Sequence, residues 1–186
     1  MKSRSVSVVP ALRVSLMAVV CLAPWSLGCP SRANEALTLS QVRGGRFHLQ
    51  IPPQQPLLLA FLQTVPDTAD SPSRGQAILL QSVDHQYASH GLCVAVIDAS
   101  QLATGRVPQH GELVNASYDW GMTIPLLEDP EHLAARRFGI RTVPTTILFK
   151  PDGSVQHRWE GPVHPAEFAQ EIERLAGGPL GRVRDL

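Results

Sequence analysis

The cysteines of this 186-residue chain are few and widely spaced: Cys21, Cys29 and Cys93. Cysteine matters first because its thiolate attacks disulfides and binds metals. Cys21 and Cys29 fall in an N-terminal segment that we expect to lie outside the fold. The folded body then keeps Cys93 alone, and a single thiol cannot form an internal disulfide or an internal dithiol pair.

Cys93 stands within the apolar run 92–97 (LCVAVI). A free cysteine in such a run behaves as a small buried hydrophobic residue and is usually inert. We therefore expect Cys93 to be structural.

The other groups that could carry chemistry do not form a recognisable set. The seven histidines are scattered, and none pairs with another at metal-ligand spacing. The hydroxyls of Thr68 and Ser71 are weak nucleophiles without a general base, and no histidine is near them in sequence. Asp67 and Asp70 precede a predicted helix, where carboxylates favour the helix dipole. No metal and no cofactor is predicted.

Composition excludes one large class of partner. The 16 basic and 16 acidic residues give a formal net charge of zero, with no basic stripe. Aromatic residues make up only 5% of the chain, which leaves few surfaces for base stacking. Nucleic-acid binding is therefore not expected.

The N-terminal segment 1–33 has the layout of a targeting signal. Basic residues precede a short apolar run at 14–23, which suits a signal peptide and is too short for an ordinary membrane span. Two alternatives stay open: a lipoprotein signal with lipidation at Cys29, and an uncleaved membrane anchor. In each case we expect an extracytoplasmic domain (secreted, periplasmic or on the outer face of the membrane), with membrane contact only through the anchor or lipid.

The remaining chain reads as a linker at 34–46, one domain at 47–176 and a flexible tail at 177–186. Hydrophobic periodicity, prolines and glycines set the expected elements. The predicted strands are 47–51, 57–62, 92–97, 145–150 and 155–159, with a short extended piece at 124–129. The predicted helices are 71–89, 112–120, one capped by Asp129 and one opened by Pro165, and 98–111 is predicted to be a surface loop. This order indicates an α/β fold with a mixed central sheet and helices on both faces.

The segment FGIRTVPTTILFKPDGSVQHRWEG, residues 138–161, gives this order a family likeness. It resembles the C-terminal half of the TlpA/ResA group of extracytoplasmic thiol-disulfide oxidoreductases, in the thioredoxin-like superfamily. The resemblance extends over about 47–175 and implies the thioredoxin fold. It also implies that Pro144 is a cis-proline and that Val143, Pro144 and Thr145 form one wall of a substrate-binding groove.

The opposite wall departs from the family. Active members carry Trp-Cys-x-x-Cys after the first central strand, where a helix N-terminus lowers the pKa of the first cysteine. The aligned residues here are Pro66-Asp67-Thr68-Ala69, which supply no thiolate. Peroxiredoxin chemistry is disfavoured for the same reason, because threonine and proline are present but the cysteine is not.

These observations give three hypotheses of function. The first is a redox-inactive member that binds a protein or peptide partner in the cis-proline groove. The second is an active thiol-disulfide oxidoreductase or antioxidant protein that uses Cys93, or Cys29, with an external thiol. The third is a purely structural lipoprotein partner in cytochrome or envelope maturation.

Overall fold

The computed structural model describes residues 36–176. The predicted signal segment with Cys29 and the predicted tail at 177–186 lie outside the described residues.

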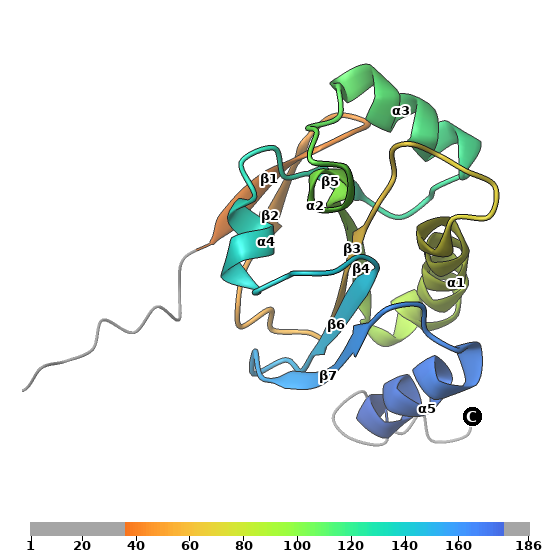
Figure 1. Cartoon of the computed structure of the whole chain (residues 1–186). Helices are drawn as coiled ribbons and strands as arrows, with labels where there is room; N and C mark the ends of the chain where they lie inside the picture. The colour runs from red at the N-terminus through yellow and green to blue at the C-terminus, as the bar shows by residue number, and fades with distance from the viewer. Residues whose placement is uncertain (1–35, 177–186) are drawn as a thin grey trace, which may run out of the picture. The chain divides into compact units, whose positions relative to one another are not determined.

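A seven-stranded mixed sheet forms the centre of the described domain, in the order β2-β1-β5-β4-β3-β6-β7 (Figure 1). The central strand β3 pairs in parallel with β4 and antiparallel with β6. The strands are β1 Leu37–Gln41, β2 Arg46–Leu49, β3 Leu57–Leu62, β4 Cys93–Asp98, β5 Leu126–Glu128, β6 Thr145–Phe149 and β7 Val155–Glu160.

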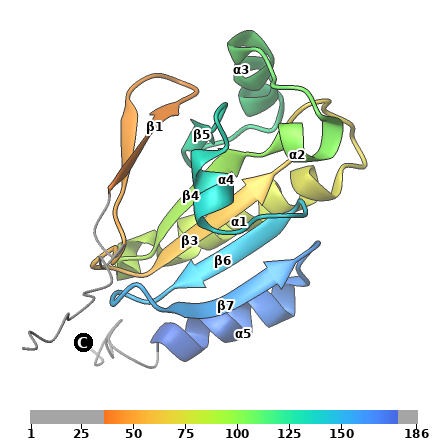
Figure 2. The same ribbon diagram turned by 60° about the vertical axis from the view of Figure 1, so that its left-hand side comes forward.

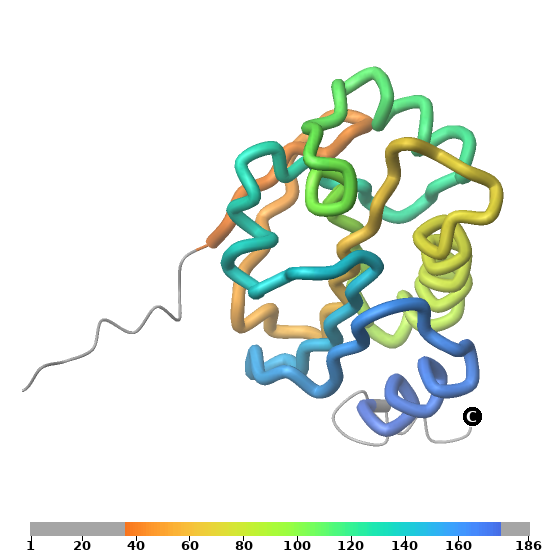
Figure 3. The backbone as a smooth tube through the Cα atoms, viewed as in Figure 1, coloured from red at the N-terminus to blue at the C-terminus, as the bar shows by residue number. Residues whose placement is uncertain are grey.

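Helices cover both faces of this sheet, as the sequence predicts. Figure 2 shows α1 and α5 behind the sheet and α4 in front of it, and the backbone trace in Figure 3 follows the same path. The helices are α1 Pro72–Tyr87, α2 Ser100–Thr104, α3 His110–Asp119, α4 Leu133–Arg137 and α5 Pro165–Ala176, with a short 3-10 turn at Ala88–His90.

The side chains of β3 explain why it lies at the centre. All six residues of LLLAFL are buried, as expected for a strand covered on both faces. Leu58, Ala60 and Leu62 face α1 and α5, where they meet Leu80 and Phe168. The alternate residues face the other core, which contains Ala134 and Ala135 of α4.

Three predicted elements differ from the structure. The linker expected at 34–46 contains β1, which forms a hairpin with β2 and also pairs with β5. The loop expected at 98–111 contains α2. Asp129 is not the N-cap of α4, because His132, at φ +54°, holds that position. The Asp129 carboxylate nevertheless accepts the backbone N–H groups of Ala134 (3.2 Å) and Ala135 (2.9 Å) in the first turn.

Candidate functional site

The sheet register brings the two predicted walls together. Phe61, near the end of β3, is the antiparallel partner of Thr145 at the start of β6. The residues that continue β3 and those that precede β6 therefore leave the sheet at the same end. The Val143 site, defined as Val143, Pro144 and Thr145, lies beside the start of the β3 loop, defined as residues 63–71.

The Val143 site presents unpaired backbone. The peptide bond between Val143 and Pro144 is cis. The Pro144 carbonyl accepts the Gly161 N–H at 2.8 Å, and the Thr145 hydroxyl donates to the Thr142 carbonyl at 2.7 Å. Among residues 36–176, the N–H and C=O of Val143 have no hydrogen-bond partner. Val143 is half-buried and Pro144 is buried, so the free groups of Val143 stand on a fixed frame.

The β3 loop does not place Pro66-Asp67-Thr68-Ala69 at a helix N-terminus. All four residues are exposed, and α1 begins only at Pro72. Ser71 is the N-cap, as predicted, but its side chain makes no capping bond. The first turn of α1 contains no cysteine, so the positive end of that helix has no thiol to activate.

Asp67 is the best-anchored residue of the four. Its Oδ1 accepts the Trp120 indole N–H at 2.7 Å, and its Oδ2 lies 3.3 Å from Nη1 of Arg74. Arg74 also donates to the Asp119 carbonyl at 3.1 Å. The carboxylate thus joins the loop to α1 and to the end of α3, which is a structural role. The sequence gives no sign of this contact, since 53 positions separate Asp67 from Trp120.

A buried polar cluster fixes the start of the β3 loop. The hydroxyls of Thr64 and Ser100 both donate to Oδ1 of Asp98, at 2.6 and 2.5 Å. The Ser100 oxygen also accepts the N–H groups of Thr64 and Val65, each at 2.9 Å. Burial raises the pKa of Asp98, although these hydrogen bonds oppose the shift. Ser100 is fully buried and cannot reach a substrate.

Asp98 was the one signal in the sequence for this cluster. It is an acidic residue directly after an apolar strand, where a charged group is rarely buried without partners. Its partners could not be read from the sequence, because Thr64 is 34 positions away.

Cys93 lies at the opposite end of β4 from this site. β4 runs from Cys93 to Asp98, and five residue steps of a parallel strand span about 16 Å. The thiol is free and half-buried beside a cavity of about 130 Å³ that His48 also lines. Burial, and secondarily the charge of Asp84, raise the pKa of Cys93. Such a thiol is a poor nucleophile at neutral pH and is remote from the Val143 site.

The histidines remain dispersed in the fold. Within residues 36–176, no group of three or more histidine, cysteine or acidic side chains could hold a metal ion. His110 contacts Glu128 at 2.5 Å and His132 contacts Gln101, so both imidazoles have side-chain partners.

Comparison with known proteins agrees with this architecture. The sequence profile of the thioredoxin-like domain matches residues 84–176, which is half of the chain. The chain belongs to the thioredoxin-like family. A search of curated proteins finds no significant match.

Solved structures extend the likeness to the whole described fold. A thioredoxin-family thiol:disulfide interchange protein from Chlorobium tepidum superposes with a TM-score of 0.61 at 20% identity, covering 80% of this chain and 96% of its own. A secreted disulfide oxidoreductase from Mycobacterium tuberculosis gives 0.61 at 14% identity, covering 75% and 96%. StoA from Bacillus subtilis gives 0.60 at 16% identity, covering 75% and 97%. At these identities the likeness establishes the fold.

The described domain contains no helix that is long and apolar enough to cross a membrane.

Proposed function

We propose that this protein is an extracytoplasmic thioredoxin-like domain that binds an extended protein or peptide segment at the Val143 site and performs no thiol-disulfide exchange of its own. The main support is that the N–H and C=O of Val143 have no hydrogen-bond partner within the described residues. An extended chain beside such a residue can form the two hydrogen bonds of a β-bridge. Binding there needs no thiol.

The proposal that the protein performs no thiol-disulfide exchange depends on the β3 loop. Asp67 anchors the β3 loop through Trp120 and Arg74, where active relatives would present a reactive dithiol. Cys93 has a raised pKa and stands about 16 Å along β4 from the loop. Extracytoplasmic placement is supported by the signal-like segment 1–33 and by the secreted relative of the same fold.

Amide NMR tests the binding proposal. The mature domain is titrated with reduced, carboxymethylated α-lactalbumin, an unfolded polypeptide without free thiols. The Val143 amide should shift more than other amides and exchange more slowly with solvent, because it enters a hydrogen bond. An unchanged Val143 amide at saturation would refute the proposal.

Photo-crosslinking provides an independent measurement with a matched control. A benzoylphenylalanine placed at exposed Thr142, beside Val143, should capture the same polypeptide. The same group at Val155, 54% exposed at the far end of the β6–β7 hairpin, should not. Equal capture at both positions would indicate non-specific contact.

An insulin-reduction assay with dithiothreitol separates the alternative enzyme function. The proposal predicts no rate above the dithiothreitol background. A rate that disappears in Cys93→Ser would instead support an oxidoreductase that uses this thiol.

A further inference from the structure

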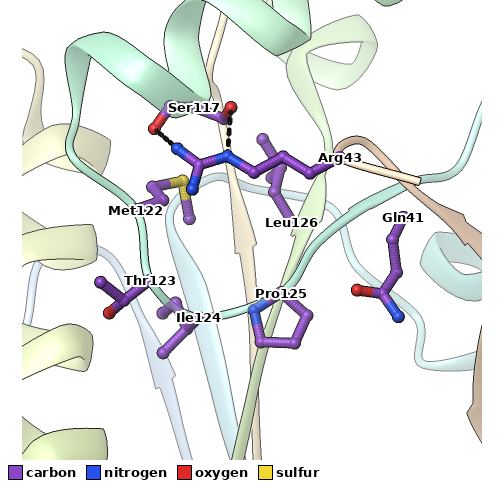
Figure 4. A pocket seen from close by; sticks show the side chains of 8 residues that line it. All are labelled: Gln41, Arg43, Ser117, Met122, Thr123, Ile124, Pro125 and Leu126. Atoms are coloured by element: carbon purple, nitrogen blue, oxygen red, sulfur yellow. Dashed lines mark hydrogen bonds between the residues drawn. The ribbon is translucent and has the colours of Figure 1, made fainter. Parts of the chain in front are cut away.

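A second candidate site, independent of the Val143 site, lies at the C-terminal end of α3. It is a cavity of about 110 Å³ between the residues that follow β1, the last turn of α3 and the segment that leads into β5 (Figure 4). Its lining residues are Gln41, Arg43, Ser117, Met122, Thr123, Ile124, Pro125 and Leu126.

Arg43 is held in place across one side of this cavity. Its Nε donates to the Ser117 hydroxyl at 3.2 Å, and its Nη2 donates to the Ser117 carbonyl at 2.9 Å. The guanidinium also stacks on the Tyr118 ring, 4.4 Å from its centroid. These contacts fix the plane of the guanidinium group before any ligand arrives.

The charge of Arg43 is not neutralised by the protein. None of the ion pairs formed within residues 36–176 includes Arg43. Its third nitrogen, Nη1, has no hydrogen-bond partner in that range, and Figure 4 shows this nitrogen on the cavity side, above Ile124. A pre-positioned, unpaired guanidinium is complementary to a carboxylate.

The size of the cavity limits the ligand. Sites for drug-sized molecules have about 300–1,000 Å³, and this cavity is well below that range. It can hold one acidic side chain or a very small free acid. Arg43 is exposed, and a lone carboxylate held there gains too little to remain bound without further contacts.

The neighbouring surface favours a polypeptide as the source of the carboxylate. Tyr118, which stacks on Arg43, is 66% exposed, and tyrosine and arginine are the residue types enriched at protein interfaces. We propose that the Arg43 cavity receives a glutamate or aspartate side chain of a partner protein, with Tyr118 forming the adjacent contact.

NMR titration with an octaglutamate peptide tests this assignment. The Arg43 Nε–H and the amides of Ser117 and Ile124 should shift in a saturable way, with weaker affinity as salt increases. Arg43→Gln should lower the affinity at least tenfold. Arg46→Gln is the matched control, since it removes the same charge three positions away, and it should change the affinity less than threefold.

A second variant covers the case in which loss of the Ser117 contacts disturbs folding. Gln41→Glu leaves Arg43 intact and places a carboxylate in the lining of the same cavity, so it should compete with the peptide and also lower affinity tenfold. Equal losses in Arg43→Gln and Arg46→Gln, or no shift at Ser117 and Ile124, would overturn the site. Saturation by sodium acetate at the same concentration as the peptide would overturn the assignment to a polypeptide.

Discussion

Replacing Asp67 by alanine should destabilise the domain by about 2 kcal/mol, because the Trp120 indole N–H then loses its acceptor. Trp120 is only 5% exposed, so water cannot replace the carboxylate easily. A hydrogen bond to a charged group contributes roughly 1.5–3 kcal/mol, and an unsatisfied buried donor costs a similar amount. For a domain of about 140 residues, 2 kcal/mol corresponds to a fall in Tm of about 7 °C.

The Arg74 contact with the same carboxylate should contribute much less. The two side chains are 30% and 24% exposed, and exposed ion pairs contribute about 0–1 kcal/mol. We therefore expect Arg74→Ala to cost no more than about 1 kcal/mol. Asp67→Asn, which keeps an acceptor for Trp120 but removes the charge, should fall between the two.

Urea denaturation followed by far-ultraviolet circular dichroism measures these differences without relying on tryptophan fluorescence. A double-mutant cycle with Asp67→Ala and Trp120→Phe should give a coupling energy of at least about 1 kcal/mol. Asp70→Ala is the control, because Asp70 is exposed in the same loop and its side chain forms no hydrogen bond or ion pair within residues 36–176. It should change stability by less than about 0.5 kcal/mol. A coupling energy near zero would refute the view that Asp67 anchors the β3 loop.

Three further predictions concern single residues. Burial raises the pKa of Asp98, so the folded state holds this proton more tightly than the unfolded state does. The free energy of unfolding should therefore fall as pH rises from the ordinary aspartate range through the raised pKa. Urea titrations of Asp98→Asn at several pH values should show no such fall. Iodoacetamide should alkylate Cys93 at pH 7 at least about tenfold faster in denaturant than in the folded domain, because burial raises its pKa, and equal rates would contradict this. Gly153→Ala should lower stability by about 2 kcal/mol, since φ is +83° and the new Cβ would meet the Pro52 backbone at 3.0 Å. Gly91→Ala is the control, because its φ is +85° but its new Cβ would lie in open space, and it should cost only about 1 kcal/mol. Equal losses in the two thermal melts would show that the contact with Pro52 is unimportant.

Local signals in the sequence were sufficient for the C-terminal half of the fold. Pro151-Asp152-Gly153 predicts the β6–β7 hairpin, and the apolar spacing after Pro165 predicts α5, whose Phe168, Ile172 and Leu175 are all buried. Both patterns depend on residues a few positions apart. The thioredoxin fold follows once these elements are joined to the buried strands β3 and β4.

The N-terminal hairpin was missed although it has a signal. Leu37-Thr38-Leu39-Ser40 alternates apolar and polar residues, and Gly44 and Gly45 both have positive φ in the turn. The polar composition of 34–46 outweighed that alternation. β1 is a strand because β2 and β5 both pair with it, and such pairing cannot be read from five residues.

The sequence named the two segments of the candidate site but not the contacts that hold them. The pairing of Phe61 with Thr145 places both segments at one end of the sheet, and their role as the walls of a groove stays a prediction. What holds the β3 loop is long-range: Trp120 reaches Asp67, and Ser100 reaches Thr64 and Val65. Each partner is on a different element, and the sequence offers no spacing rule that joins them.

The absence of a dithiol affects the Val143 site and the β3 loop differently. At Val143 the backbone alone carries the proposed function, so no side chain there had to be kept for catalysis. In the β3 loop, the contacts of Asp67 with Trp120 and Arg74 hold in place a segment that carries no thiol. A loop fixed to Trp120 makes a rigid edge beside Val143, and a rigid edge lowers the entropic cost of holding an extended chain. Asp67→Ala should therefore weaken binding of carboxymethylated α-lactalbumin as well as stability, whereas Asp70→Ala should change neither.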